Sequence, residues 1–266
     1  MTDESVSAAA LEREVQGLRK KLARVELKTQ TLEMLQEQNA NLMRALMSDL
    51  DAEKAESERL LLNILPEPVA QRLKTESGVI ADSYESASVL FADIVDFTPL
   101  SESLAAEEMV EWLNDVYSAL DALVERHGVE KIRTIGDGYM VAAGVPFRRE
   151  DHAPAITRLA LDIRDHIEAM PPVRGHKPSL RIGINSGALV GGVIGTHKFQ
   201  YDLWGDAVNI AARMESQGVP GRIQITEATR ALLGDEFSCE PRGTIEVKGK
   251  GEMNTWFVSH AHQDPM

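Results

Sequence analysis

"SVLFADIVDFTPLSE" (residues 88–102) joins a hydrophobic stretch to two acidic residues. Ser88 to Ala92 has the composition of a buried strand, and Asp93 and Asp96 follow directly. An unpaired carboxylate is costly on an apolar element because it loses its hydration there. Something must therefore compensate Asp93 at the strand end, whereas we interpret Asp96 as a turn or helix-start residue.

The sequence around this stretch alternates between strand and helix patterns from Tyr84 to Val258. The first strand is followed by an amphipathic helix that ends at Gly128, a hairpin centred on Gly136-Asp137-Gly138, and a second helix and strand. This order predicts a ferredoxin-like α+β fold, a mixed sheet flanked by helices. We expect the first strand to lie beside the first strand of the hairpin.

That arrangement would bring Asp93 and Asp137 together at one end of the sheet. Mg²⁺ takes few protein oxygens and completes its shell with water and phosphate. Two such ions can hold an attacking and a leaving oxygen in line. Each aspartate also has an ordinary explanation, because Asp137 suits an aspartate–glycine turn and Asp93 a strand-end cap or ion pair. Their expected convergence favours a metal site.

Residues 1–65 have a different pattern, with apolar residues at alternating spacings of three and four. One heptad register holds over about seven repeats, which predicts a long coiled-coil helix that dimerises and transmits signals. A single surface helix is the alternative. The apolar residues at the two seam positions are Leu11, Val15, Leu18, Leu22, Val25, Leu32, Met43, Leu46, Leu50, Leu60 and Ile64. Polar residues that weaken this seam are Thr29, Gln36, Asn39, Glu53 and Ser57.

Composition limits the possible functions. The net charge is −14, and residues 76–266 carry most of it, with 17 basic and 29 acidic side chains. An acidic body argues against nucleic acid as a partner. Cys239 is the only cysteine, so an internal disulfide is impossible. We expect a cytoplasmic protein, or the cytosolic portion of a larger or membrane-tethered one.

Four stretches together resemble the class III nucleotidyl cyclase catalytic domain. They are "FADIVDFTPLSE" (91–102), "KIRTIGDGYMVAAGVP" (131–146), "YDLWGDAVNIAARMES" (201–216) and "VKGKGEMNTWFV" (247–258). Four separated motifs in one order are far more specific than a lone glycine motif. The resemblance implies a head-to-tail homodimer with two active sites at its interface. Together with the heptad pattern, it divides the chain into a coil (1–65), a connecting segment (66–83) and a catalytic domain (84–262).

The resemblance also implies site residues. Asp93, Asp137 and the carbonyl of Ile94 match ligands of two divalent metal ions, Mg²⁺ or Mn²⁺. Asn209 matches the residue that orients the ribose, and Arg213 the one that stabilises charge on the α-phosphate. These last two are four residues apart on a predicted helix and share one face, which by itself indicates only a solvated surface.

Lys248 and Lys250 lie in the stretch that supplies a lysine to the polyphosphate, although "KGKG" alone is typical of a basic turn. The resemblance does not decide between the two lysines. In the family, the metal ligands of each active site come from one subunit, and the base-reading, ribose and arginine groups come from the other.

Arg133 and Asp202 match the two positions that select the base, with arginine where the adenylyl pattern has lysine. Arg133 only donates hydrogen bonds, which suits adenine N1, and ionised Asp202 only accepts them, which suits the N6 amine. Guanine reverses both roles, and the guanylyl pattern would place glutamate at position 133. We therefore expect an adenylate cyclase that converts ATP to 3′,5′-cyclic AMP and pyrophosphate.

Two other functions remain open. One is a guanylate or relaxed-specificity cyclase, and the other is a catalytically silent dimeric signalling module. We also expect an upstream sensor or regulator to act on the coil.

Overall fold

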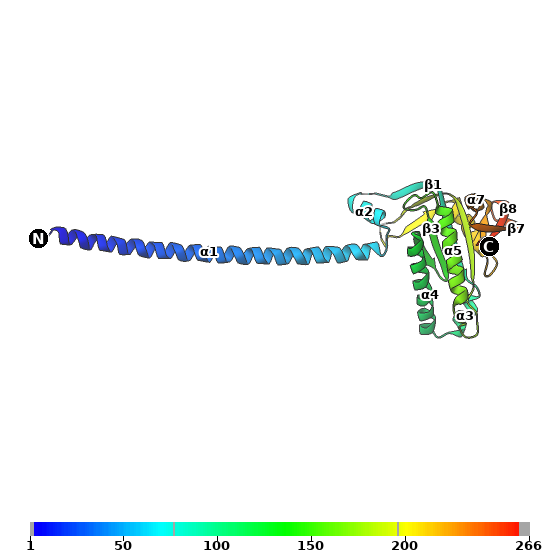
Figure 1. The fold of residues 1–266 in the computed structure, drawn as a ribbon, viewed down its shortest axis with the longest axis horizontal. Coiled ribbons are helices and arrows are strands. Elements are labelled where there is room, and N and C mark those ends of the chain that lie inside the picture. Colours follow the sequence, from blue (N-terminus) through cyan, green and yellow to red (C-terminus); the bar gives the residue numbers. More distant parts are fainter. Residues whose placement is uncertain (1–2, 77, 196, 261–266) are drawn as a thin grey trace, which may run out of the picture. The chain divides into compact units, whose positions relative to one another are not determined.

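The computed structural model describes residues 3–76, 78–195 and 197–260, with side chains from residue 11 onward. The chain divides into two compact units, residues 1–61 and 62–266 (Figure 1). The outer limits predicted for the coil and the catalytic domain, at residues 1 and 262, lie outside the described residues. Among the described helices, none combines the length and the apolar character needed to cross a bilayer.

The first unit is α1 (Asp3–Leu62), one uninterrupted helix of 60 residues, so the predicted long helix is confirmed. Its apolar seam side chains are exposed, for example Leu18 (58%), Leu22 (59%) and Leu32 (61%). A row of exposed leucine and valine along a helix is what a coiled-coil partner covers. The coil itself stays a prediction.

The second unit contains an eight-stranded sheet with the order β2-β3-β1-β4-β6-β8-β7, and β5 pairs with β4. β1 is antiparallel to β3 and β4, whereas β4 is parallel to β6, so the sheet is mixed as predicted. The strands are β1 (Ile80–Ile94), β2 (Glu130–Ile135), β3 (Gly138–Ala143), β4 (Leu180–Val193), β5 (Tyr201–Trp204), β6 (Ile223–Thr226), β7 (Phe237–Val247) and β8 (Gly251–His260).

Helices cover both faces of this sheet. They are α2 (Glu67–Thr75), α3 (Phe97–Ser103), α4 (Ala106–His127), α5 (His152–Ala169), α6 (Asp206–Ser216) and α7 (Glu227–Arg230). Figure 1 shows α4 and α5 side by side, and their buried residues form one core with Ile182 and Ile184 of β4. Gly183 lies between these two isoleucines, and a Cβ there would meet α6. Because successive strand residues face opposite sides, α6 covers the other face.

The hairpin occurs where predicted, but its neighbour in the sheet differs. β2 and β3 are antiparallel around the Gly136-Asp137 turn. β1 pairs with β3, the second strand of the hairpin, so the prediction that it lies beside the first strand was wrong. The reason is that β2 forms an outer edge of the sheet, which strand patterns alone do not reveal.

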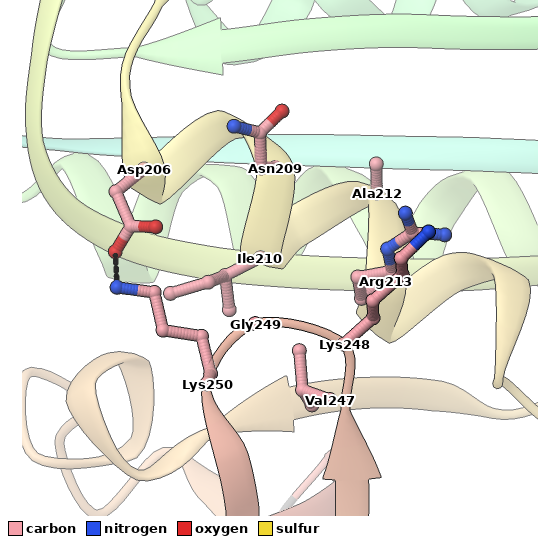
Figure 2. A pocket seen from close by; sticks show the side chains of 9 residues that line it. All are labelled: Asp206, Asn209, Ile210, Ala212, Arg213, Val247, Lys248, Gly249 and Lys250. Carbon is pink, nitrogen blue, oxygen red and sulfur yellow. Dashed lines mark ion pairs between the residues drawn. The ribbon is translucent and has the colours of Figure 1, made fainter.

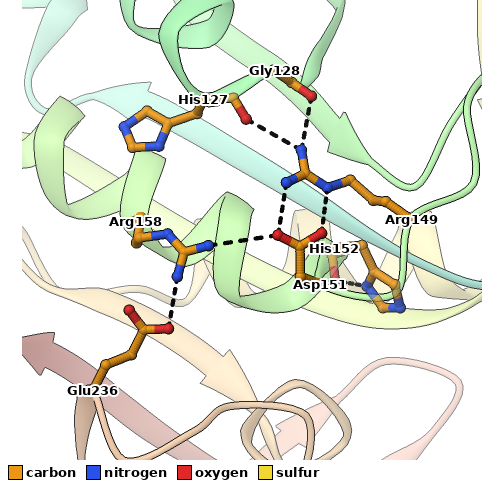
Figure 3. Close-up of polar contacts among 8 residues, drawn as sticks. His127, Gly128, Arg149, Asp151, His152, Arg158 and Glu236 are labelled. Atoms are coloured by element: carbon orange, nitrogen blue, oxygen red, sulfur yellow. Dashed lines mark hydrogen bonds and ion pairs between the residues drawn. The ribbon is translucent and has the colours of Figure 1, made fainter.

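Polar contacts tie the end of α4 to the start of α5 (Figure 3). Arg149 Nη1 donates to the carbonyl oxygens of His127 (3.2 Å) and Gly128 (2.9 Å), which end α4. Its Nε and Nη2 donate to the two carboxylate oxygens of Asp151, immediately before α5. Arg149 therefore links the end of α4 to the start of α5.

Candidate active site

The structure brings Asp93 and Asp137 together. Asp93 is the penultimate residue of β1 and lies opposite Gly138 in the ladder with β3. Asp137 directly precedes Gly138 in the hairpin turn, and Gly136 before it has φ = 62°, a left-handed conformation that favours glycine. Ile94 ends β1 with its side chain buried, so its carbonyl is the group left to act as a ligand.

Asp137 is partly buried and lies close to a second carboxylate, that of Asp93. Burial raises its pKa, and the charge of Asp93 and a hydrogen bond with that carboxyl group raise it further. Two carboxylates this close repel each other when both are ionised, and a cation between them relieves that cost. No group of three or more His, Cys, Asp and Glu side chains suited to a metal occurs within the described residues. A cation here would rely on the two aspartates, water and phosphate oxygens.

Arg181 is a further charged residue beside this pair. It lies opposite Asp93 in the β1–β4 ladder, and its Nη2 donates to Asp93 Oδ2 at 2.7 Å. Its Nε contacts Glu215 Oε1 of α6 at 3.4 Å. Burial and the charge of Asp93 raise the pKa of Glu215 to about 7. The sequence analysis did not select Arg181 or Glu215, because only the strand register and the packing of α6 bring them to Asp93.

A second group of predicted residues surrounds a pocket of about 610 Å³ between α6 and the β7–β8 turn (Figure 2). Its lining residues are Asp206, Asn209, Ile210, Ala212, Arg213, Val247, Lys248, Gly249 and Lys250. The polar part of the lining thus combines one amide with three cationic side chains and one carboxylate. Such a pocket suits an anionic ligand that also carries hydroxyl groups.

The two lysines of the pocket differ in their contacts. Lys250 Nζ forms an ion pair with Asp206 Oδ2 at 2.6 Å (Figure 2). Lys248 and Arg213 have no ion pair with any residue that the structure describes. Lys248 is therefore the lysine whose charge is free for a ligand.

Arg133 and Asp202 are joined directly. Arg133 Nη1 on β2 donates to Asp202 Oδ2 on β5 at 2.7 Å, and the other oxygen of Asp202 accepts from the backbone N–H of Leu203 at 2.8 Å. The Asp202 side chain is only 13% exposed. Arg133 Nε is buried and has no hydrogen-bond partner in the described part of the chain. The pair thus retains a donor group that a ligand could satisfy.

Within one chain the carboxylates and the pocket lie on different sides of α6. Arg213 lines the pocket, whereas Glu215, two residues later, contacts Arg181 on the carboxylate side. Helix residues two apart do not face each other. Neither Asp93 nor Asp137 lines the pocket. One chain therefore carries two separate groups of predicted site residues that face different directions.

Comparison with known proteins identifies the family of this α+β domain. The chain belongs to the adenylate and guanylate cyclase catalytic domain family, whose model matches residues 79–260. The matched range includes every strand that the structure describes and both groups of predicted site residues.

Relatives of both nucleotide specificities are similar to the chain. An adenylate cyclase of Mycobacterium tuberculosis is 48% identical over 210 residues, which are 79% of this chain and 47% of that protein. The guanylate cyclase soluble subunit beta-2 of Rattus norvegicus is 42% identical over 240 residues, 90% of this chain and 34% of that protein. The chain thus spans half or less of the length of these relatives.

A solved structure has the same fold. It is the catalytic core of a rhodopsin-guanylyl cyclase with converted specificity, in complex with ATPαS. The TM-score is 0.65 at 39% sequence identity, and the match covers 68% of this chain and 98% of that one. The chain is thus similar to both kinds of cyclase, and this similarity does not decide between ATP and GTP.

Proposed function

We propose that the protein is an adenylate cyclase that converts ATP to 3′,5′-cyclic AMP and pyrophosphate. The observation that carries the choice of ATP is the 2.7 Å pair of Arg133 and Asp202. It presents one obligate donor and one obligate acceptor side by side, as the N1 and N6 edge of adenine requires. With Arg133 at position 1 of the base and Asp202 at position 6, as the family resemblance implies, guanine would place donor against donor and acceptor against acceptor, a mismatch that discriminates strongly.

The partners of Arg133 and Asp202 in the free chain support this assignment. Each already bonds the other, and Asp202 is held by the Leu203 N–H, so the two side chains have a fixed relative orientation. The buried Arg133 Nε offers a donor without a partner among the described residues. Guanylate cyclases among the relatives make GTP the second candidate.

Asp93, Asp137 and the Ile94 carbonyl would hold the divalent ions, Mg²⁺ or Mn²⁺. Bound there, the ions would make the ribose 3′-OH more acidic and neutralise phosphate charge. The repulsion between the two aspartates fits such a role. Arg181 already bonds Asp93, so it orients that carboxylate.

The residues around the pocket would act on the rest of the nucleotide. Asn209 would orient the ribose so that its 3′ oxygen faces the α-phosphorus. The new O3′–phosphorus bond forms as the bond to the bridging oxygen of pyrophosphate breaks, and the 3′ proton is released. Arg213 and Lys248, which have no ion-pair partner in the described chain, would stabilise the charge that develops on these oxygens.

A complete site then requires two subunits. The carboxylates and the pocket face different sides of α6 in one chain, which supports a head-to-tail homodimer with each site shared. A parallel coil formed by α1 would raise the effective concentration of the two catalytic domains. It would also connect them to an upstream sensor or regulator.

The test is product formation by the purified protein. Incubation with ATP and Mn²⁺ should give cyclic AMP and pyrophosphate in equal amounts, and Asp137→Ala should give neither. If the wild type forms no cyclic product from ATP or GTP, the cyclase proposal is wrong and the silent signalling module is the better interpretation.

A further inference from the structure

Tyr117 of α4 reaches the turn that carries Asp137. Its hydroxyl donates to the carbonyl oxygen of Gly136 at 3.1 Å, and Gly136 is the residue immediately before Asp137. The sequence motifs did not select Tyr117, which lies 20 residues earlier in the chain. This bond is a direct link between a helix and the two-residue hairpin turn.

The ring of Tyr117 stacks on that of Tyr139. Its ring lies 5.8 Å from the ring of Tyr139, with 15° between the planes, and Tyr139 is buried in β3. The Tyr139 hydroxyl donates to Asp121 Oδ1 at 2.5 Å. Lys131 Nζ bonds the same carboxylate at 2.7 Å and lies 5.2 Å from the centre of the Tyr139 ring. The stack therefore connects α4 to both strands of the hairpin.

The helix that supplies Tyr117 is itself fixed. Val116 and Leu120 flank Tyr117 on α4 and are almost fully buried in the core. Arg149 bonds the carbonyls at the end of the same helix. A rigid helix can transmit its position to a turn through a single hydrogen bond, whereas a mobile one cannot.

We propose that Tyr117 is a positioning residue for Asp137: its hydroxyl fixes the Gly136–Asp137 turn so that Asp137 converges with Asp93 on a divalent cation. This inference rests on the proposed function. Tyr117 would not touch the nucleotide. It acts only through the Gly136 carbonyl.

The ionisation of Tyr117 is compatible with this role. Burial and the charges of Asp137 and Asp93 raise its pKa to about 12. The hydroxyl therefore keeps its proton at neutral pH and remains a donor to the carbonyl.

The variant that isolates the hydroxyl is Tyr117→Phe, which keeps the ring and its stack. The matched control is Tyr84→Phe, because the Tyr84 hydroxyl also donates to a backbone carbonyl, that of Pro146, at 3.2 Å. Mn²⁺ binding is measured by electron paramagnetic resonance on the full chain with 3′-deoxy-ATP, which lacks the attacking hydroxyl. This readout needs no turnover.

Tyr117→Phe should weaken Mn²⁺ binding by roughly 3- to 10-fold, the effect of one lost hydrogen bond. Its kcat at saturating Mn²⁺ should stay within about twofold of wild type, because the reacting groups are unchanged. Tyr84→Phe should bind Mn²⁺ like the wild type.

Three results would overturn the inference. Wild-type Mn²⁺ affinity in Tyr117→Phe, with binding lost in Asp137→Asn, would reject the role of Tyr117 and leave the proposed function intact. Equal weakening in Tyr117→Phe and Tyr84→Phe would indicate general loss of stability. Absence of Mn²⁺ binding in the wild type would reject the metal site of the proposed function, and the inference with it.

Discussion

Gly183 of β4 and Glu215 of α6 are in direct backbone contact. A Cβ built at position 183 would lie 2.0 Å from the backbone nitrogen of Glu215 and 2.4 Å from the carbonyl carbon of Met214. No real Cβ tolerates such distances, so only glycine lets α6 approach the sheet here. This contact fixes the helix that carries both Asn209 and Arg213.

Gly183→Ala should therefore destabilise the catalytic unit by at least about 3 kcal/mol, because backbone rather than a flexible side chain must move. That corresponds to a fall in Tm of roughly 6–12 °C for a domain of this size. Thermal unfolding followed by circular dichroism measures it. Gly234→Ala is the control, since a Cβ there meets nothing within 4 Å. Equal Tm values for the two variants would show that α6 moves freely.

The shared site can be tested by mixing inactive chains. Asp93→Ala removes a carboxylate and Arg213→Ala removes a group of the pocket, so each variant alone should be inactive. In a mixed dimer one site combines the two intact halves. Equal mixing with free exchange should restore roughly a quarter of wild-type activity, because half of the dimers are mixed and each has one good site.

The control for this experiment mixes Asp93→Ala with Asp137→Ala. Both changes affect the same half-site, so every site in every dimer is defective and activity should stay absent. Recovery in this control, or none in the first mixture, would contradict the shared site.

The predicted coil gives two leucines of α1 different roles in dimerisation. Leu32 lies at a seam position, and Leu27 lies on the outer side of the same register, although both are about equally exposed (61% and 64%). Leu32→Glu should weaken dimerisation at least tenfold, because it places two charges inside a parallel seam. Leu27→Glu should leave the dimer unchanged. Sedimentation equilibrium measures both dissociation constants, and equal values would argue against this register.

Glu130 gives the catalytic unit a pH-dependent stability. Burial at the start of β2 raises its pKa to about 7, from a value near 4.5 in the unfolded chain. The folded state thus binds this proton more tightly than the unfolded chain does. The protonated Glu130 therefore contributes stability that is present at low pH and is lost as the pH rises from 4.5 to 7. Glu130→Gln should therefore be more stable than wild type at pH 8, by about 1–2 kcal/mol after allowance for partial exposure.

Urea unfolding at pH 5 and pH 8 measures the difference in free energy of unfolding between Glu130→Gln and the wild type. That difference should be much smaller at pH 5. Glu102→Gln, at an exposed position, is the control, and its stability should follow the wild type at both values. A constant gain for Glu130→Gln at both pH values would mean that packing, rather than ionisation, distinguishes the two side chains.

Local patterns were sufficient to predict much of the fold. Asp93 at a strand end, the glycine-flanked Asp137 and the long heptad helix each follow from short-range sequence signals. The contact of Arg181 with Asp93 could not be predicted in this way, because it depends on the register of strands 88 residues apart. β5 is only four residues long, which is too short for a periodic signal, yet it brings Asp202 to Arg133.

The choice between the lysines also needed three-dimensional information. In "KGKG" each lysine is followed by a glycine, so the sequence does not distinguish the two. In the structure, Lys250 pairs with Asp206, whereas Lys248 has no ion pair within the described chain. Tyr117 gave no motif at all, since its function depends on the distance between α4 and a turn.

The central claim is that the Arg133–Asp202 pair selects ATP. Its most direct test is kcat/KM of the purified wild type for ATP and for GTP at the same saturating Mn²⁺ concentration. ATP should be preferred by at least about tenfold, because guanine would set a donor against Arg133 and an acceptor against Asp202. Arg133→Glu should lose that preference. A wild-type kcat/KM for GTP equal to or above that for ATP would contradict the claim.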